Sequence, residues 1–460
     1  MERSRADAVV IGSGAGGAPA AALLAESGRR VLVLEAGPRL GTRDFSGREG
    51  EMLSRLFRNT ATEGTRQALY AGACVGGSTV VNDALCFRTP PPVLAAWREQ
   101  LALEGFEAQV EQAWRDVHAE ATDRAHTNRN AQRLALGAQR LGWRAEPIAR
   151  NVRGCANLGL CNFGCPTGAK QSTLLTYVPR AERAGARVRA GLRAERIEIA
   201  AGAVRAVRAG ALRIETPLVL VAAGVLETPA LLQRSGIQAG RDLQLHSSLY
   251  VSARYREPIH GYHGPTMGWG VTEFAPDFML ENVTVHPIAT ALALPGFGRD
   301  HEAAMASLPF LARTVVLLRD RSRGRVEADG KVRYALCRDD LARLRRGLAA
   351  AARLHLAAGA EAVFLPLQRP HRVRSEAEIE AALPRELDAS LLASLYAVHL
   401  FGGAPMGASP ETSACNEQGS VWGVRGLYVC DASALPGNTG VNPQITIMAN
   451  ALRVAAAIAA

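Results

Sequence analysis

The chain has 460 residues, of which 48% are apolar, and this length predicts two joined domains rather than one hydrophobic core. No run offers the roughly eighteen uninterrupted apolar residues of a membrane helix, so we expect no membrane span. The net charge is +10, but 51 of the 53 basic residues are arginines, which points to a GC-rich genome, and no RNA- or DNA-binding module is recognisable.

The N-terminus has early arginines, an apolar middle and small residues, as a secretory signal does. Asp7 interrupts this pattern, and the glycines that follow have another explanation. We therefore expect no signal peptide and a cytoplasmic protein. The remaining cysteines outside one cluster are scattered, so a framework of disulfides is not expected in that compartment.

Residues 6–37 predict a strand, a helix and a second strand. The strands are expected at 8–11 and 31–34, and the helix between them at 15–27, ended by Gly28. Gly12, Gly14 and Gly17 fit G-x-G-x-x-G, in which the glycines permit a tight turn, the approach of a pyrophosphate, and close packing of helix on strand. The helix N-terminus then faces the phosphate. Glu35, at the end of the second strand, suits the hydroxyls of an unphosphorylated ribose, which predicts FAD or NAD.

The stretch CANLGLCNFGCP brings Cys155, Cys161 and Cys165 together, with Pro166 directly after them. A Cys-Pro pair after closely spaced cysteines is typical of iron–sulfur runs. Zinc is less suited because no fourth Cys or His lies nearby, and a disulfide would use only two of the thiols. Two readings remain: three thiolates that hold an iron–sulfur cluster, or a glycine-rich connector without metal.

The second half of the chain supplies further elements. Residues 219–232 predict a strand, a small-residue turn and a helix of the N-terminal domain, and Asp-Gly at 329–330 predicts a hairpin. Near the C-terminus a strand at 426–430 precedes Asp431, a loop rich in glycine and proline, and a helix from Gln444. An acid beside a second helix N-terminus can complete a long cofactor site, which favours FAD over NAD.

The motifs together resemble the glucose–methanol–choline (GMC) oxidoreductase family of FAD enzymes. The matching segments are GSGAGG with EAG, VGGSTVVNDALCFR at 75–88, AAGVLETP at 222–229, HLFGGAPMG at 399–407, and LYVCDASALPGNTGVNPQITIMANALR at 427–453. They follow the order of the family along the whole chain.

The resemblance implies an α/β fold with a discontinuous, Rossmann-like FAD-binding domain and an α+β substrate domain built on an antiparallel sheet. The FAD-binding domain is expected from residues 1–88, 172–240 and 395–460. By the same resemblance, residues 89–171 are expected to form a cap or linker segment, and residues 241–394 the substrate domain. Besides the N-terminal motif, the cofactor residues implied by the resemblance are Gly76, Gly77, Ser78, Asn82, Ala223, Asp431, Ala432 and Pro443.

The resemblance also implies the chemistry, which is oxidation of an alcohol with transfer of a hydride to flavin N5. His399 in H-x-x-G-x-x-x-M matches the catalytic histidine of the family, and Asn442 stands where the family has His or Asn. We expect His399 to act as the base for the hydroxyl proton and Asn442 to position the oxygen. The implied partner is a small-molecule alcohol, whose identity the sequence does not define.

The cysteine run resembles a GMC subgroup that includes membrane-linked sugar and gluconate dehydrogenases, some of which hold a three-iron, four-sulfur cluster. That cluster would pass electrons to a protein partner, so we expect a dehydrogenase rather than an oxidase. Four alternatives stay open: an alcohol oxidase, a hydroxynitrile-type lyase or photodecarboxylase with FAD, a binding protein without catalysis, and an NAD-dependent dehydrogenase.

Overall fold

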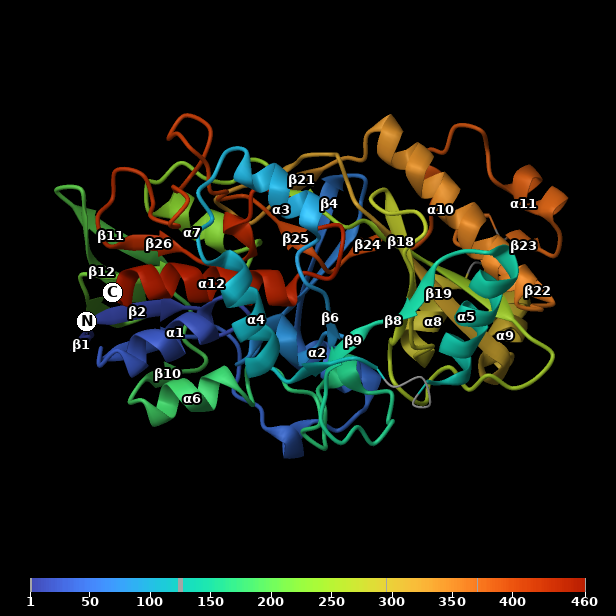
Figure 1. Ribbon diagram of the computed structural model, residues 1–460, viewed down its shortest axis with the longest axis horizontal. Coiled ribbons are helices and arrows are strands. Elements are labelled where there is room, and N and C mark those ends of the chain that lie inside the picture. The colour runs from blue at the N-terminus through green and yellow to red at the C-terminus, as the bar shows by residue number, and fades with distance from the viewer. Residues whose placement is uncertain (1, 123–126, 295, 370, 460) are drawn as a thin grey trace.

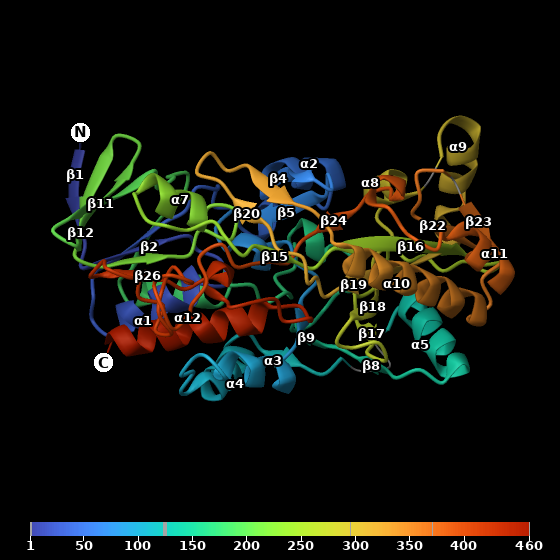
Figure 2. The same ribbon diagram turned by 90° about the horizontal axis from the view of Figure 1, so that it is seen from above.

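The computed structural model describes residues 2–122, 127–294, 296–369 and 371–459. Two bodies lie end to end along the long axis, one around a parallel sheet and the other around a large mixed sheet (Figure 1). Both termini lie at the far end of the first body (Figure 2). This arrangement confirms the expected fold class.

The parallel sheet is assembled from distant parts of the chain. Its strand order is β10-β3-β2-β14-β26, and every pair is parallel. The strands are β10 (Arg187–Arg189), β3 (Val31–Leu34), β2 (Ala8–Ile11), β14 (Val219–Val221) and β26 (Leu427–Val429). Helix α1 (Gly17–Glu26) packs against both α6 (Tyr177–Arg183) and α12 (Gln444–Ala459). The central strands are apolar throughout because both faces of a parallel sheet are covered.

The large sheet has twelve strands and is mainly antiparallel. Its path runs through β20 (Arg325–Val326), β21 (Val332–Tyr334), β4 (Phe57–Gly64), β5 (Ala68–Gly72), β24 (Tyr396–Ala397), β16 (Ser248–Arg254), β19 (Leu311–Leu318), β18 (Phe278–Asn282), β17 (Trp269–Val271) and β8 (Ala145–Pro147). Strand β22 (Ala362–Leu365) joins β16 to β23 (His371–Val373).

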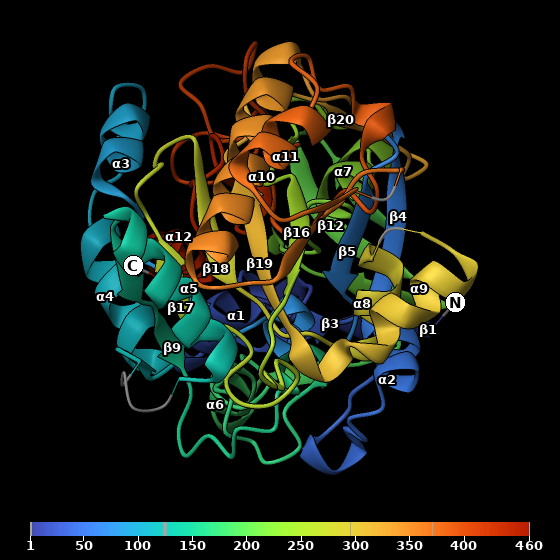
Figure 3. The ribbon, with the colours of Figure 1, turned by 90° about the vertical axis from the view of Figure 1, so that its right-hand side faces the viewer.

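One face of this sheet is covered by helices, and the other face is turned toward a cavity. Helices α10 (Arg338–Ala357) and α5 (Arg129–Leu141) cover one face (Figure 3). Because side chains alternate along a strand, Leu249, Leu280 and Val316 pack toward those helices. Their neighbours Tyr250 and Glu281 lie on the other face, which is turned toward a cavity.

The remaining elements connect and cover these two bodies. The smaller sheets contain β1 (Glu2–Arg5), β13 (Leu212–Glu215), β12 (Ala203–Ala209) and β11 (Arg196–Ala200); β6 (Leu85–Cys86), β9 (Ala149–Asn151) and β7 (Ala119–Glu120); and β15 (Gln244–Leu245) with β25 (Leu400–Phe401). The other helices are α2 (Glu49–Leu56), α3 (Pro91–Arg98), α4 (Phe106–Asp116), α7 (Thr228–Arg234), α8 (Pro287–Ala293), α9 (Gly298–Ala306) and α11 (Glu376–Ala382).

The elements expected from the sequence are largely present. The strands at 8–11 and 31–34, the helix from Gln444 and the hairpin around Asp329 and Gly330 are confirmed. The division into domains stays a proposal, and the large sheet also takes β4 and β5 from 1–88 and β24 from 395–460. Within the part of the chain that the structure describes, no helix combines the length and apolarity needed to cross a bilayer.

Candidate active site

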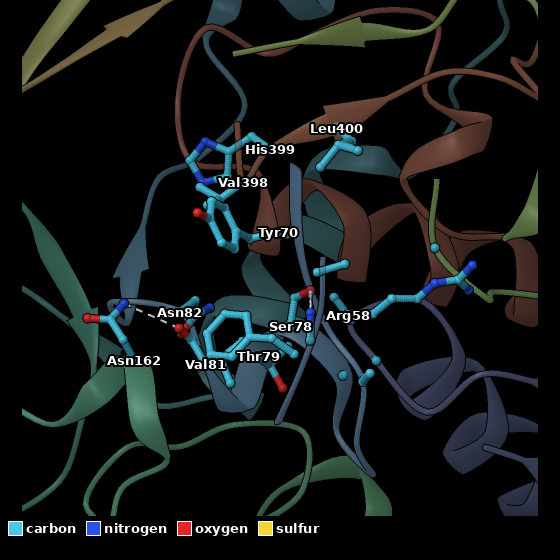
Figure 4. A pocket seen from close by; sticks show the side chains of 18 of the residues that line it. Arg58, Tyr70, Ser78, Thr79, Val81, Asn82, Asn162, Val398, His399 and Leu400 are labelled. Atoms are coloured by element: carbon cyan, nitrogen blue, oxygen red, sulfur yellow. Dashed lines mark hydrogen bonds between the residues drawn. The ribbon is translucent and has the colours of Figure 1, made fainter. Parts of the chain in front are cut away.

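A cavity of about 680 Å³ is lined by residues from both bodies (Figure 4). Most of the residues expected at the cofactor or at the chemistry line it, namely Gly12, Gly14, Glu35, Gly77, Ser78, Asn82, Ala223, His399, Asp431, Ala432, Asn442 and Pro443. Gly17, Gly76 and the three clustered cysteines do not. The fold thus brings together residues that are more than 400 positions apart.

The turn between β2 and α1 forms the floor of one end of the cavity. Gly12 has φ of +101°, and a Cβ there would lie 2.1 Å from the carbonyl oxygen of Ala222. At Gly17 an added Cβ would lie 1.9 Å from the carbonyl oxygen of Gly12. These two glycines are therefore required by the turn and by its packing, as the motif predicts.

Gly14 differs from both, because an added Cβ would meet only the Cα of Gly77, at 3.7 Å. The protein itself therefore leaves the space in front of Gly14 open. That space lies before the N-terminus of α1, where backbone N–H groups favour an anion. The cradle fits a pyrophosphate, and this supports FAD as the occupant.

Glu35 lies at the end of β3 and is 8% exposed. Its carboxylate accepts hydrogen bonds from the Ser13 backbone N–H at 3.1 Å, the Ser13 hydroxyl at 2.7 Å and the Gly37 N–H at 2.9 Å. Burial raises its pKa, while these three bonds favour the ionised form. About one of the four acceptor positions of a carboxylate remains, which is enough for one ribose hydroxyl.

The segment after β5 passes over the cradle as a 3₁₀ turn, Gly77–Val80. The N–H of Gly76 donates to the Ser13 hydroxyl at 3.0 Å, which ties this turn to the β2–α1 turn. The buried ammonium of Lys170 donates to the carbonyl oxygens of Val80, Asn82 and Cys161. Lys170 thus fixes the backbone that presents Asn82 to the cavity.

Asp431 joins three segments below the cavity. Its carboxylate accepts from the N–H of Gly224 at 2.7 Å, the hydroxyl of Thr228 at 2.6 Å and the N–H of Ser433 at 2.8 Å. Burial raises its pKa, and these bonds oppose that shift. Asp431 therefore holds the end of β14 and α7 to the C-terminal return, in addition to lining the site.

A pair of histidines lies beside the cradle. Nδ1 of His246 is 3.2 Å from Nδ1 of His399, and Nε2 of His246 accepts the N–H of Gly440 at 3.1 Å. Burial lowers the pKa of His399 to about 4, and it lowers the pKa of His246 well below its usual value. Both rings are therefore neutral at pH 7. Sequence reasoning missed His246, because no motif surrounds it.

The wall formed by β18 and β19 carries polar groups that no motif predicts. Glu281 is 1% exposed, and burial with the negative charge of Asp83 raises its pKa to about 8, while the amide of Asn442 opposes that rise. Among the described residues, Oε1 of Glu281 and Oδ1 of Asn442 have no hydrogen-bond partner. Arg313 from β19 also lines the cavity. The only sequence signal is a charge inside an otherwise apolar strand.

The clustered cysteines give the expected iron–sulfur site no support. Within the described residues, no group of three His, Cys, Asp or Glu side chains is arranged to hold a metal. The thiol of Cys161 is buried beside Nη2 of Arg150 at 3.4 Å. The sulfur of Cys165 accepts the N–H of Lys170 at 3.5 Å and pairs with the Thr167 hydroxyl. The iron–sulfur prediction is thus without support, and Cys161 and Cys165 contact different protein groups.

Sequence comparisons identify relatives over nearly the whole chain. Two family models described as GMC oxidoreductase match residues 6–248 and 320–451. An uncharacterized GMC-type oxidoreductase of Mycobacterium tuberculosis is 35% identical over 476 residues, which cover 98% of this chain and 75% of the relative. A long-chain-alcohol oxidase of Arabidopsis thaliana is 32% identical over 506 residues, which cover 99% of this chain and 67% of the relative.

Solved structures share the fold at lower identity. A pyridoxine 4-oxidase from Mesorbium loti superposes with a TM-score of 0.75 at 18% identity and covers 98% of each chain. A formate oxidase of Aspergillus oryzae, studied for its FAD modification, superposes with a TM-score of 0.76 at 15% identity, over 100% of this chain and 98% of the other.

Proposed function

The chain belongs to the GMC oxidoreductase family, and from this premise we propose that it oxidises an alcohol to an aldehyde or ketone with His399, Asn442 and Glu281 at the reacting hydroxyl. The observation that carries the proposal is the position of all three in the cavity that also contains the phosphate cradle. When bound, FAD supplies the acceptor for the hydride that leaves the alcohol carbon.

The hydrogen bonds of His246 favour a role for His399 as hydrogen-bond donor, whereas the sequence predicts that His399 is the base. Because Nε2 of His246 accepts the Gly440 N–H, the proton of this neutral ring is on Nδ1. This Nδ1–H donates a hydrogen bond to Nδ1 of His399, so the single proton of the neutral His399 ring is on its Nε2. In this tautomer His399 offers an N–H to the alcohol oxygen and stabilises the negative charge that develops there.

Glu281 can then take the hydroxyl proton. Its unpartnered Oε1 lies in the wall of the cavity near Asn442, and a pKa of about 8 is well placed for proton transfer near neutral pH. The side-chain N–H groups of Asn442 can donate both to Glu281, which favours its carboxylate form, and to the alcohol oxygen. His399 and Asn442 therefore orient the oxygen, and Glu281 receives the proton.

We infer oxygen as the electron acceptor. A separate redox partner is expected only where an iron–sulfur cluster is present, and the described cysteines give such a cluster no support. The plant relatives are named long-chain-alcohol oxidases, which supports an oxidase. Peroxide formed in step with the aldehyde would support this inference, and turnover restricted to artificial acceptors would contradict it.

The function is tested by mixing the purified flavoprotein with a panel of alcohols without oxygen. We expect the flavin to bleach with at least one class of alcohol, with one carbonyl product formed for each flavin. A lyase of the same fold would cleave a hydroxynitrile and leave the flavin oxidised, and that result would overturn the proposal.

A further inference from the structure

Arg313 is a buried cation whose guanidinium is incompletely hydrogen-bonded within the described residues. It lies in the middle of β19, is 0% exposed and lines the cavity. Nε donates to the Ser252 hydroxyl at 3.3 Å, whereas Nη1 and Nη2 have no hydrogen-bond partner among the described residues. An unpaired buried charge is costly, so a ligand is expected to complete it.

The charge of Glu49 favours the cationic form of Arg313, but the hydrogen bonds of its carboxylate go elsewhere. Both oxygens of Glu49 accept backbone N–H groups at the start of α8, from Ile288 at 2.7 Å and Ala289 at 2.8 Å. Glu281 is largely protonated at pH 7, because its pKa is about 8. The guanidinium instead lies against the ring of Tyr250, with Cζ 4.9 Å from the centroid, and this contact orients its plane without cancelling the charge.

A second unpartnered group accompanies it. Nε2 of His286 is buried in the same cavity and has no partner among the described residues, and its ring packs on Phe163 at 4.5 Å. Burial and the charge of Arg313 lower the pKa of His286 to about 3, so it is neutral. The subsite therefore offers one positive charge and one neutral imidazole, which suits a monoanion better than a phosphate dianion.

The register of the sheet gives the position of this subsite. Glu281 on β18 lies opposite Val315 on β19, two residues from Arg313 on the same face. Two residues along a strand correspond to about 7 Å between Cα positions. We propose that the substrate is a hydroxy acid, whose carboxylate binds Arg313 with both Nη groups while its hydroxyl meets His399 and Asn442. This inference rests on the proposed alcohol oxidation for the hydroxyl end only.

The first test measures binding without turnover. Calorimetry of the FAD-loaded protein with butanoate and with butanamide compares a carboxylate with a neutral group of equal size. We expect butanoate to bind at least 10-fold more tightly than butanamide. Arg313→Met should weaken the binding of butanoate by about 10- to 100-fold, which is the range of a charged hydrogen-bonded pair. Arg313→Lys should be intermediate, because an ammonium lacks the planar fork.

Arg254→Met is the matched control, because Arg254 ends a strand of the same sheet, pairs with Glu361 and does not line the cavity. It removes the same charge and should leave butanoate binding unchanged. Arg313→Met should fold well, since an apolar side chain replaces an unpaired buried charge. Equal binding of butanoate and butanamide by the wild-type protein would overturn the subsite.

The second test separates the subsite from the proposed function. Flavin reduction by 4-hydroxybutanoate is compared with reduction by its methyl ester. Faster reduction by the acid, lost in Arg313→Met, supports the inference, and equal rates overturn it while leaving alcohol oxidation intact. If neither compound reduces the flavin, the hydroxy-acid substrate is overturned even where butanoate binding still depends on Arg313, and reduction by another alcohol of the panel would leave the proposed alcohol oxidation intact.

Discussion

Nδ1 of His246 lies 3.2 Å from Nδ1 of His399, and the two rings meet edge to face with centroids 5.3 Å apart. The contact fixes the tautomer of both rings because Gly440 donates to the other nitrogen of His246. A histidine whose Nδ1 accepts a hydrogen bond presents an N–H at Nε2. In the proposed mechanism His399 is therefore the donor to the substrate oxygen.

Replacement of His399 tests this role. His399→Ala removes the donor and should slow flavin reduction by about 10²- to 10³-fold, as loss of one transition-state donor does, while the FAD content stays normal. His399→Gln keeps an amide N–H and should retain more of the rate than His399→Ala. Stopped-flow absorbance without oxygen measures both. Equal rates in the wild-type protein and His399→Ala would exclude the role.

The pH dependence of the rate of flavin reduction should follow the ionisation of Glu281 rather than that of the histidines. As the proposed base, Glu281 must be a carboxylate to accept the proton. With a pKa of about 8, roughly one tenth of the Glu281 side chains are ionised at pH 7. The rate of flavin reduction should therefore rise through pH 8 and level off above it. His399, with a pKa of about 4, stays neutral over that range. Glu281→Gln should lower the rate and remove the rising limb. A limb that persists in this variant would assign it to another group.

The cofactor cradle is tested at Gly14. Gly14→Val should yield folded protein without FAD, because the protein leaves room for a Cβ at this position but a larger side chain fills the pyrophosphate space. Gly41→Val is the control, since an added Cβ at Gly41 meets only the Asp44 carboxylate at 3.8 Å, outside the cavity. Circular dichroism and the ratio of FAD to protein measure the outcome. Full flavin in Gly14→Val would refute the cradle.

Protein purified without oxygen should contain no stoichiometric iron. The described cysteines 155, 161 and 165 form no metal-binding group, and Cys165 is held by Thr167 and Lys170. Cys165→Ser should therefore keep the FAD content and the rate of flavin reduction. About three irons per chain in the wild-type protein, and their loss in Cys165→Ser, would contradict this prediction. That result would support an iron–sulfur cluster and a separate redox partner.

The parts that local sequence defines were predictable. Gly12, Gly17 and Glu35 lie within one strand–helix–strand unit, where turn geometry leaves few choices. The helix from Gln444 and the acid at Asp431 follow from a short strand and a glycine-rich loop of the same kind.

The parts that depend on tertiary packing were not predictable. His246, Glu281 and Arg313 lie on or beside strands of the large sheet, and their roles depend on which face each strand turns to the cavity. The cysteine run shows the converse, because close spacing does not determine where side chains in a loop point. Resemblance to the family supplied His399 and Asn442, whereas the tautomer required the backbone of Gly440.

Oxidation of an alcohol at this site is measured by titrating the anaerobic flavoprotein with a reactive alcohol while flavin absorbance and carbonyl product are recorded together. We expect complete loss of the oxidised flavin band with one aldehyde or ketone per FAD. Alcohol oxidation would be contradicted if the flavin stayed oxidised and no alcohol of the panel were consumed. It would also be contradicted if folded protein without FAD turned over the substrate.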